Sequence, residues 1–554
     1  MLKLATILDN AGEPPVQSRY RDPAELAALG YTGVVLYETT ALSGVTSPEF
    51  VRDPELRNWL NHALQALTER IDQISGAGLE TYLSYDLLVL ATDAVEGKNN
   101  NLCCRGRGKV LCPASPDIWD RVYAVLEALL ERYPAVAGVV LRFGDNDAQR
   151  LPHLIGNDLY TPHCSRCADW SAADRIVHAI TQGHDRIVEK LGKRMIVRAW
   201  NVRPDGLHDN PDLAAMVAPR LPQRDDDRLI LSFKFTQTDF WRYQNWNPSS
   251  LVCGQTPILY ELQCQREFEG KGALPNNQAA LWRDGYPESA TTDQPQGLAQ
   301  LAERLPLAGL WCWVRGGGWG GPFIKNETWI DASAFAAPRL ADDPQADPAA
   351  LAREWAITRL ELHENDPLVE VLTEILADSA EMIRQAFYIG PFARLKPSPW
   401  HPNGDWIEDD TLDAHAAWRM IQRIPLTDLD AVLDEKAAAA ATAARLYRKL
   451  QEALGDREHE TMAPLLGSMI YTESLLEAIH DLFAGLIAYR SFQSTRSKSA
   501  AETARRALYH AQSHWNHHTQ RHTAYRQAAT PFRENGFWDL TQEILTDLDQ
   551  ALST

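Results

Sequence analysis

The chain has 554 residues, of which 45% are hydrophobic, so it is long enough for two or three domains with substantial cores. Its formal net charge of −20 argues against nucleic acid or an anionic membrane as a partner, because both require a basic face. The sequence shows no signal-peptide pattern, and no apolar stretch approaches the roughly 20 residues that span a bilayer. We therefore expect a cytoplasmic protein without a membrane partner, whose eight cysteines are mostly reduced.

Eight short apolar runs, each ending in a charged or amide residue, occupy the first 320 residues. In chain order they cover residues 4–9, 32–38, 79–86, 138–145, 195–201, 229–239, 258–267 and 309–315. Helical patterns separate most of these runs, and the clearest are at 54–75 and 115–132. Eight strand–helix units are the number that closes a parallel barrel, so we predict an α/β fold, a (β/α)8 TIM barrel, over residues 1–335.

The pattern changes near residues 336–349, where Ala, Asp and Pro are frequent in a way that is typical of a domain boundary. Beyond them strand patterns vanish, and long helical stretches are predicted at 350–361, 367–385, 426–454, 457–490 and 498–528. The alanine-rich stretch 436–450 has high helix propensity. We predict an all-α helical C-terminal domain over residues 336–554, and we expect a homodimer through this domain.

Charged side chains gather at the C-terminal ends of the predicted strands, the rim on which barrel enzymes carry their active sites. In the sixth strand Lys234 alternates with Phe233 and Phe235, which predicts that the lysine points into the barrel. Four polar side chains of the seventh strand share one face, and the last of them is Glu267. Because Asp239 and Glu267 end neighbouring strands, we expect their carboxylates to lie close together.

Carboxylates on two sides of a pocket are what glycoside hydrolysis requires, because one protonates the leaving oxygen and another activates water. The fourth and fifth strands add Arg142 and Arg198 to the same rim. Together with Lys234 they would bind a carboxylate of the substrate. The alternative is an ion network that lines the barrel without catalysis, although barrel interiors are normally filled by branched apolar residues.

Several segments resemble those of the family 67 glycoside hydrolases, the α-glucuronidases that remove (4-O-methyl)glucuronic acid from xylo-oligosaccharides. KFTQTDF at 234–240 and ELQCQREFEG at 261–270 are similar to that family's motifs on the sixth and seventh strands. RFGDND at 142–147 and VRAWN at 197–201 resemble its motifs on the fourth and fifth strands. GWGGPFIKNETW at 318–329 is similar to the segment that leads into the family's helical domain. The resemblance covers most of the chain, which lacks a counterpart of the family's N-terminal β domain.

The resemblance implies an inverting mechanism, in which Asp239 and Glu267 hold and deprotonate the attacking water. The general acid would be Asp147, where the family has a glutamate, and Asp145 and Asp9 are the alternatives. Substrate-binding side chains are expected at Arg142, Arg198, Lys234, Asp9, Asn201 and Trp319. No cofactor is expected to be required for this reaction.

We therefore expect an inverting exo-glycoside hydrolase that removes a terminal α-linked acidic sugar, similar to glucuronic acid, from an acidic oligosaccharide. One alternative is an inverting exosialidase on the same barrel, because that reaction also needs cations for a carboxylate. Another is a non-catalytic protein that binds a sugar acid, because the side chain of Asp147 is one methylene shorter than glutamate.

Five cysteines and a histidine fall in the predicted loops after the third and fourth strands. They are Cys103, Cys104, Cys112, His163, Cys164 and Cys167. The CxxC spacing of Cys164 and Cys167 is a common zinc half-site, and neighbouring loops of the rim can bring further ligands to it. Two interpretations remain open, a structural zinc site and reduced loop thiols without a metal.

Overall fold

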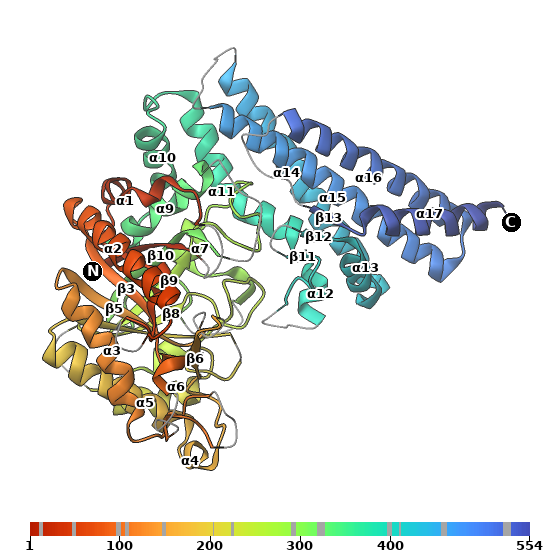
Figure 1. The fold of residues 1–554 in the computed structure, drawn as a ribbon. Helices are drawn as coiled ribbons and strands as arrows, with labels where there is room; N and C mark the ends of the chain where they lie inside the picture. The colour runs from red at the N-terminus through yellow and green to blue at the C-terminus, as the bar shows by residue number, and fades with distance from the viewer. Residues whose placement is uncertain are drawn as a thin grey trace.

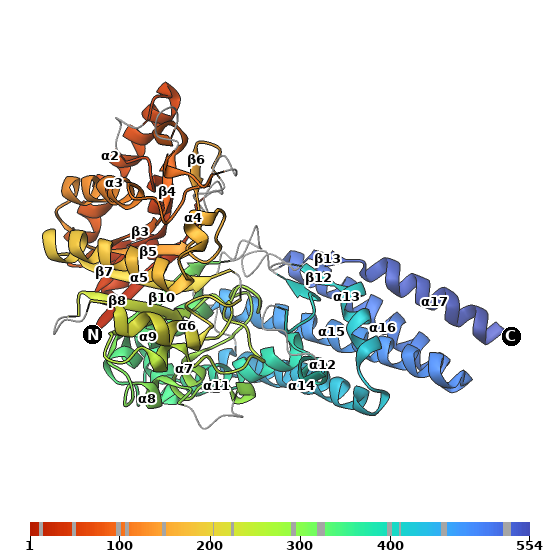
Figure 2. The ribbon, with the colours of Figure 1, turned by 90° about the horizontal axis from the view of Figure 1, so that it is seen from below.

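The computed structural model describes residues 1–9, 15–46, 51–95, 101–105, 110–146, 151–202, 204–222, 227–289, 295–317, 327–395, 401–408, 411–455, 462–524 and 533–553. Figure 1 shows a barrel built from the first part of the chain and an elongated set of helices built from the last part. Figure 2, turned by 90°, shows the same long helices extending away from one side of the barrel. The predicted (β/α)8 barrel followed by a helical domain is confirmed.

Eight parallel strands close the barrel within the described residues. In order around the ring they are β1 (Leu2–Leu8), β2 (Gly33–Leu36), β3 (Glu80–Asp86), β5 (Val136–Gly144), β7 (Arg194–Asn201), β8 (Leu229–Lys234), β9 (Ile258–Gln263) and β10 (Leu307–Gly316). Pairing of β10 with β1 completes the ring. Each strand coincides with a predicted one, but β8 and β9 end early, so Asp239 and Glu267 lie in the loops that follow them.

The barrel interior changes from apolar to charged along the strands. The apolar layer includes Leu4, Val35, Tyr82, Val140, Ile196, Ile230 and Leu259. Side chains of a strand alternate between its two faces, so the next interior position on a strand is two residues further on. On four strands these next positions are Arg142, Arg198, Ser232 and Glu261, and all four are buried. A charged layer therefore lies directly on the apolar one, toward the C-terminal ends of the strands.

Helices pack around the outside of the barrel. They are α1 (Pro23–Leu29), α2 (Pro54–Gly76), α3 (Ile118–Arg132), α5 (Ala172–Gly183), α6 (Pro211–Val217), α7 (Ala279–Asp284), α8 (Leu298–Leu301) and α9 (Thr328–Asp342). The side chain of Asp53 caps the start of α2, and apolar residues at three- and four-residue spacing bury one side of that helix. The expected boundary at residues 335 and 336 falls inside α9, which packs against β1, β10 and α1.

A short antiparallel pair and a short helix lie in the loops at the C-terminal ends of the barrel strands. Strand β4 (Val89–Ala91) pairs with β6 (Leu154–Gly156), which connects the loop after β3 with the loop after β5. Helix α4 (Ser165–Ala168) follows β6. These elements bring two loops that are distant in sequence into contact on one side of the barrel mouth.

The C-terminal part is mainly helical. Its helices are α10 (Pro348–Arg359), α11 (Pro367–Phe387), α12 (Gly390–Leu395), α13 (Ala414–Arg423), α14 (Leu429–Leu454), α15 (Ala463–Thr495), α16 (Lys498–Ala524) and α17 (Phe537–Ser553). α15 packs between α14 and α16 and is buried on most sides. The strands β11 (Ile407–Glu408), β12 (Thr411–Asp413) and β13 (Arg533–Asn535) add a small sheet that the sequence pattern did not predict. None of the described helices combines the length and apolarity that crossing a bilayer demands.

Buried polar contacts join the helical part to the loops of the barrel. The hydroxyl of Tyr388, which follows α11, donates to Glu269 Oε1 at 2.8 Å. Glu269 Oε2 accepts hydrogen bonds from Arg266 Nε at 3.0 Å and from Asn276 Nδ2 at 2.7 Å. Burial alone would raise the pKa of Glu269, but Arg266, Arg242 and Asn276 together outweigh it and hold that pKa below its ordinary value. The loop after β9 is therefore fixed by contacts with both parts of the chain.

Candidate active site at the barrel mouth

Arg198 on β7 is the centre of the charged layer inside the barrel. Its Nε donates to both carboxylate oxygens of Glu261, at 3.0 and 3.1 Å, and its Nη1 donates to Asp145 Oδ2 at 3.0 Å. Ser232 Oγ donates to Glu261 Oε1 at 2.9 Å. Burial disfavours the charge of the guanidinium, but Glu261 and Asp145 outweigh this effect and raise the pKa of Arg198. Arg198, Ser232 and Glu261 occupy interior positions of their strands, so this network lies inside the barrel.

Arg142 extends this network toward β2 and β3. Its Nε lies 3.4 Å from Asp86 Oδ1, its Nη2 lies 3.5 Å from Asp145 Oδ2, and its guanidinium carbon is 4.7 Å from the ring centroid of Tyr37. Burial would raise the pKa of Asp145, but Arg142, Arg198 and Lys234 hold it below the ordinary value. An ionised carboxylate between arginines is poorly suited to protonate a leaving group.

Lys234, at the end of β8, is surrounded by aromatic rings. Its Nζ lies 3.9 Å from the ring centroid of Trp200, 4.7 Å from that of Phe240 and 4.8 Å from that of Trp313. The same nitrogen forms an ion pair with Asp239. Asp239 and Phe240 have φ angles of 42° and 62°, so the chain turns sharply after β8 and brings Asp239 back to the lysine.

Glu267 lies in the loop after β9 and is buried. Its backbone N–H donates to Gln263 Oε1 at 3.1 Å. The backbone of Gly317 approaches so closely that a Cβ there would lie 2.4 Å from Glu267 Oε2 and 2.8 Å from Gln263 Nε2. Gly317 also has a φ of +101°, so both the space and the backbone conformation require glycine at this position.

Four buried nitrogen donors next to these carboxylates have no hydrogen-bond acceptor among the described residues. They are Arg198 Nη2, Gln263 Nε2, Trp311 Nε1 and Trp313 Nε1. The guanidinium carbon of Arg198 lies 5.8 and 5.2 Å from the ring centroids of Trp311 and Trp313, and Gln263 is the register partner of Trp313. Buried donors without acceptors are costly, so these four donors fit a ligand with several acceptor oxygens.

Two further residues that were expected to bind substrate, Asn201 and Asp9, lie in the described part of the chain, and their contacts differ. Asn201, at the end of β7, lies beside Gly144 and Gly206, where a Cβ would come within 2.3 Å of its side chain. Asp9 accepts hydrogen bonds from Arg21 Nη2 at 2.7 and 2.6 Å and from the backbone N–H of Val16 at 2.8 Å. The contacts of Asp9 are therefore directed to the loop after β1. The predicted residues Asp147 and Trp319 lie outside the described residues.

The predicted metal ligands come together only in part. The Sγ atoms of Cys104, Cys112, Cys164 and Cys167 lie within 4.8 Å of one another, whereas Cys103 and His163 are not in this group. The backbone of Cys103 forms a bridge with Leu111, and neighbouring residues of an extended segment point in opposite directions. Cys104 therefore points into the group and Cys103 away from it.

Sequence reasoning missed several side chains of the mouth. Asp86 and Tyr37 contact Arg142, and Trp200 and Phe240 contact Lys234. Asp86 ends its strand in the same manner as Asp145, a signal that could have placed it at the rim. Phe240 follows a turn in an unusual backbone conformation, for which the sequence pattern offers no comparable signal.

No protein-family model matches the sequence, and neither does any curated protein. A solved structure described as a GH138 enzyme targeting pectin rhamnogalacturonan II aligns with 99% of this chain and 83% of its own, with a TM-score of 0.58 and 11% identity. A mutant O-GlcNAc hydrolase of Thermobaculum terrenum aligns with 100% of this chain and 94% of its own, with a TM-score of 0.44 and 11% identity. The first alignment shows that this chain and that enzyme share a fold, and membership of family 67 stays a prediction.

Proposed function

We propose that this protein is an inverting exo-glycoside hydrolase that removes a terminal α-linked acidic sugar from an oligosaccharide. The observation that carries the proposal is the combination at the barrel mouth of two carboxylates with buried donors that lack acceptors. Asp239 and Glu267 follow the adjacent strands β8 and β9, and the donors lie on β7, β9 and β10. Active sites of barrel enzymes occupy this C-terminal face.

In this proposal, Asp239 and Glu267 act on the attacking water. Asp239 is ion-paired with Lys234, so it is suited to accept a hydrogen bond from water and to orient it. Glu267 would take the proton as the general base. Inverting enzymes place the water between the sugar and such a base, with the general acid on the opposite side of the glycosidic bond.

The general acid must carry a proton at the working pH. Asp145 does not suit this role, because Arg142, Arg198 and Lys234 hold its pKa below the ordinary value. We therefore assign the role to Asp147, two residues further along the sequence, which the resemblance to family 67 also implies. Asp9 is the weaker alternative, because Arg21 already binds both of its carboxylate oxygens.

The charges of the mouth restrict how a substrate carboxylate would bind. Arg142, Arg198 and Lys234 are balanced by Asp86, Asp145, Glu261 and Asp239, so no cation of this set stands without an anion. The free donor Arg198 Nη2, together with Gln263 Nε2 and Trp313 Nε1, would receive the carboxylate oxygens. The carboxylate would then be recognised mainly by directed hydrogen bonds, because the net charge around it is not positive.

A substrate panel tests the proposal. The full chain would be incubated with glucuronate-bearing xylo-oligosaccharides, pectic oligosaccharides, sialyl-lactose and neutral α-glycosides, and the products followed by anion-exchange chromatography and proton NMR. Pectic substrates belong in the panel because the solved structure of the same fold is described as targeting pectin rhamnogalacturonan II. We expect an acidic sugar to be released from an α-linkage, first as its β-anomer.

Three other outcomes would overturn the proposal in different ways. Release of the α-anomer would contradict inversion, and turnover of neutral glycosides alone would contradict the acidic substrate. If no substrate reacts and glucuronate nevertheless raises the melting temperature, the protein is a binding protein for sugar acids. Release of sialic acid alone would leave the proposal standing and identify the enzyme as an exosialidase.

A further inference from the structure

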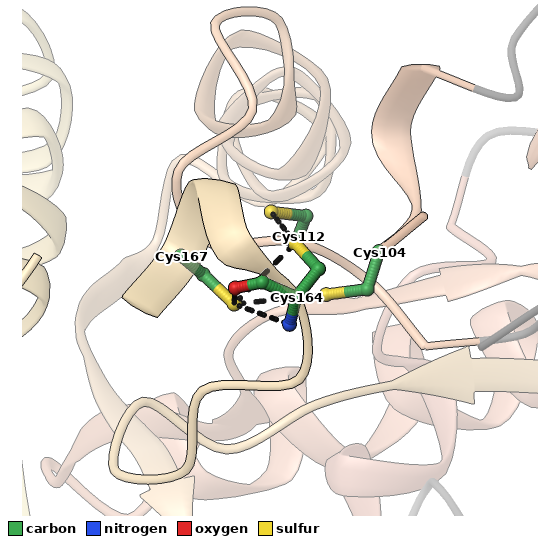
Figure 3. Close-up of side chains that lie close together, drawn as sticks. All are labelled: Cys104, Cys112, Cys164 and Cys167. Carbon is green, nitrogen blue, oxygen red and sulfur yellow. Dashed lines mark hydrogen bonds between the residues drawn. The ribbon is translucent and has the colours of Figure 1, made fainter. Parts of the chain in front are cut away.

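Four cysteines from two separate segments converge beside the barrel mouth. Cys104 and Cys112 come from the segment between β4 and α3, and Cys164 and Cys167 from the start of α4. Figure 3 shows the four side chains directed toward one another. The distance between Sγ atoms is 3.9 Å for Cys104 and Cys167, 3.7 Å for Cys112 and Cys164, and 3.6 Å for Cys164 and Cys167.

These separations fit a tetrahedral metal ion. A zinc–sulfur bond is about 2.3 Å long, so the sulfur atoms of a regular tetrahedral site lie about 3.8 Å apart. A disulfide would bring two sulfur atoms to about 2.05 Å, which is much shorter than any distance in the group. All four residues are free cysteines in this structure.

Hydrogen-bond donors surround the sulfur atoms of the group. Four thiolates around one Zn²⁺ leave two negative charges, which nearby donors must compensate. Arg166 Nε donates to Cys112 Sγ at 3.3 Å, and the backbone N–H groups of His163 and Cys164 donate to Cys167 Sγ at 3.1 and 3.3 Å. Arg166 is held in place by the backbone oxygens of Asn101 and Cys103 at 2.9 and 3.0 Å.

We propose that Cys104, Cys112, Cys164 and Cys167 bind one structural Zn²⁺. Four protein ligands complete a tetrahedral shell and leave no open position for substrate, so the ion would hold the loops together without taking part in hydrolysis. Three of the four side chains are buried, and apolar side chains such as Val110 and Ala114 pack around the group. This metal site does not depend on the proposed function.

The site would also support one wall of the barrel mouth. Asn157 Nδ2 donates to the carbonyl oxygen of Leu111 at 2.8 Å, directly before Cys112. The carbonyl oxygen of Asn157 in turn accepts a hydrogen bond from Asn146 Nδ2 at 3.2 Å. Asn146 follows Asp145, so a short chain of contacts connects the cysteines to the loop after β5. The supporting role at the barrel mouth rests on the proposed function, whereas the zinc site itself does not.

The metal content of the protein tests the proposed zinc site, and this measurement needs no substrate. The full chain would be produced with zinc in the medium, purified under reducing conditions without a chelator, and analysed by mass spectrometry for metals. We expect about one zinc per chain. Cobalt replacing the zinc should absorb in the red with the strong bands of tetrahedral thiolate coordination, together with a charge-transfer band in the near ultraviolet.

Matched variants separate this site from other thiols. Cys112→Ser and Cys164→Ser should lose most of the zinc, whereas Cys103→Ser, which changes a cysteine next to the group, should retain it. If the first two variants fail to fold, the cobalt spectrum of the wild-type chain still decides the matter. Wild-type protein with no bound metal and four freely reacting thiols in this group would overturn the proposal.

A chelator experiment tests the support of the wall. A strong zinc chelator should lower the melting temperature and the turnover together, and added zinc should restore both. If turnover is lost while the zinc content is unchanged, the fault lies with the proposed function or its catalytic residues, and the zinc site is not contradicted. Unchanged stability after complete removal of zinc would overturn the structural role.

Discussion

The mouth of the barrel and the contact between the barrel and the helical part each bury an arginine–glutamate pair, but the two sites use their donors differently. At the contact, Glu269 is bound by Arg266, Asn276 and Tyr388, and none of these four side chains has a buried polar atom without a partner. At the mouth, Arg198 binds Glu261 and Asp145 and still keeps Nη2 without an acceptor among the described residues.

This difference separates a structural ion pair from a binding site. Burying an arginine and a glutamate together is common in structural networks, and it indicates no ligand on its own. Donors left without acceptors are a more specific signal, because folding alone does not compensate them. At the mouth, a ligand with acceptor oxygens would complete the hydrogen bonding of these donors.

The largest effect is expected from the carboxylates of the mouth. Glu267→Gln and Asp239→Asn remove the general base and the carboxylate that orients the water, so each should lower turnover about 10³-fold or more. Circular dichroism and the melting temperature should stay close to wild type. Asp342→Asn, at an exposed carboxylate, serves as a control. Turnover within tenfold of wild type in both variants would remove these residues from the mechanism.

The next effect concerns stability at the contact with the helical part. Glu269→Ala leaves Arg266 buried without its anion, which should lower the free energy of unfolding by about 3–5 kcal/mol. Urea unfolding followed by fluorescence would measure this loss. Turnover per folded molecule should fall as well, because Glu269 helps to fix the loop that carries Glu267. A loss of stability below about 1 kcal/mol would contradict the description of this pair.

A pair of tryptophan variants compares a donor that lacks an acceptor with one that has a partner. Trp313→Phe removes an Nε1 without an acceptor, so KM for the acidic substrate should rise about tenfold or more, since hydrogen bonds to charged groups contribute about 1.5–3 kcal/mol. Trp329→Phe removes an Nε1 that donates to Ser468 Oγ at 2.7 Å, so it should lower stability and leave KM unchanged. Equal effects of the two variants on KM would contradict the assignment of Trp313 Nε1, but not Trp329 Nε1, to substrate binding.

Acid should weaken both networks. The pKa values of Asp145 and Glu269 are lowered in the folded state, so the stability that they contribute is present at neutral pH. It should be lost as the pH falls below about 4, the ordinary value of these carboxyls, and through their lower folded-state values. Unfolding measured across this range should be less dependent on pH in Glu269→Gln. An unchanged slope would contradict the lowered pKa of Glu269.

The smallest effect on the free energy of unfolding is expected from removing an ion pair at the surface. Lys3 Nζ lies 2.9 Å from Asp342 Oδ2, and the aspartate side chain is 62% exposed. Lys3→Ala should therefore change the free energy of unfolding by less than about 1 kcal/mol. A larger loss in the same urea experiment would show that this ion pair fixes α9 to β1.

Alternation along the strands made much of the fold and part of the mouth predictable. Lys234 points inward as expected, because it follows the apolar interior residue Ile230 by an even number of positions. The ion pair between Lys234 and Asp239 could not be read from the pattern, because it depends on a turn with positive φ angles. The contact of Asp9 with Arg21 depends in the same way on the path of a loop.

Pairing between short strands that are distant in sequence, and the direction of single side chains in loops, could not be predicted from the sequence pattern either. Strand β13 has three residues and pairs with β12 across more than a hundred residues of chain, so neither segment has a detectable strand pattern of its own. The cysteine spacing predicted a meeting of two loops but could not separate Cys103 from Cys104. That choice depends on the direction of each side chain from an extended backbone.

The hydrogen bond between Tyr388 and Glu269 has a consequence for any attempt to shorten the chain. Glu269 is two residues from Glu267, so a hydroxyl contributed by the C-terminal helices helps to fix the loop that carries the candidate base. A truncated barrel would retain every carboxylate of the mouth and lose this brace. Catalytic competence would then require both halves of the polypeptide, and recombining the barrel with foreign helices would succeed only if they supplied an equivalent phenol.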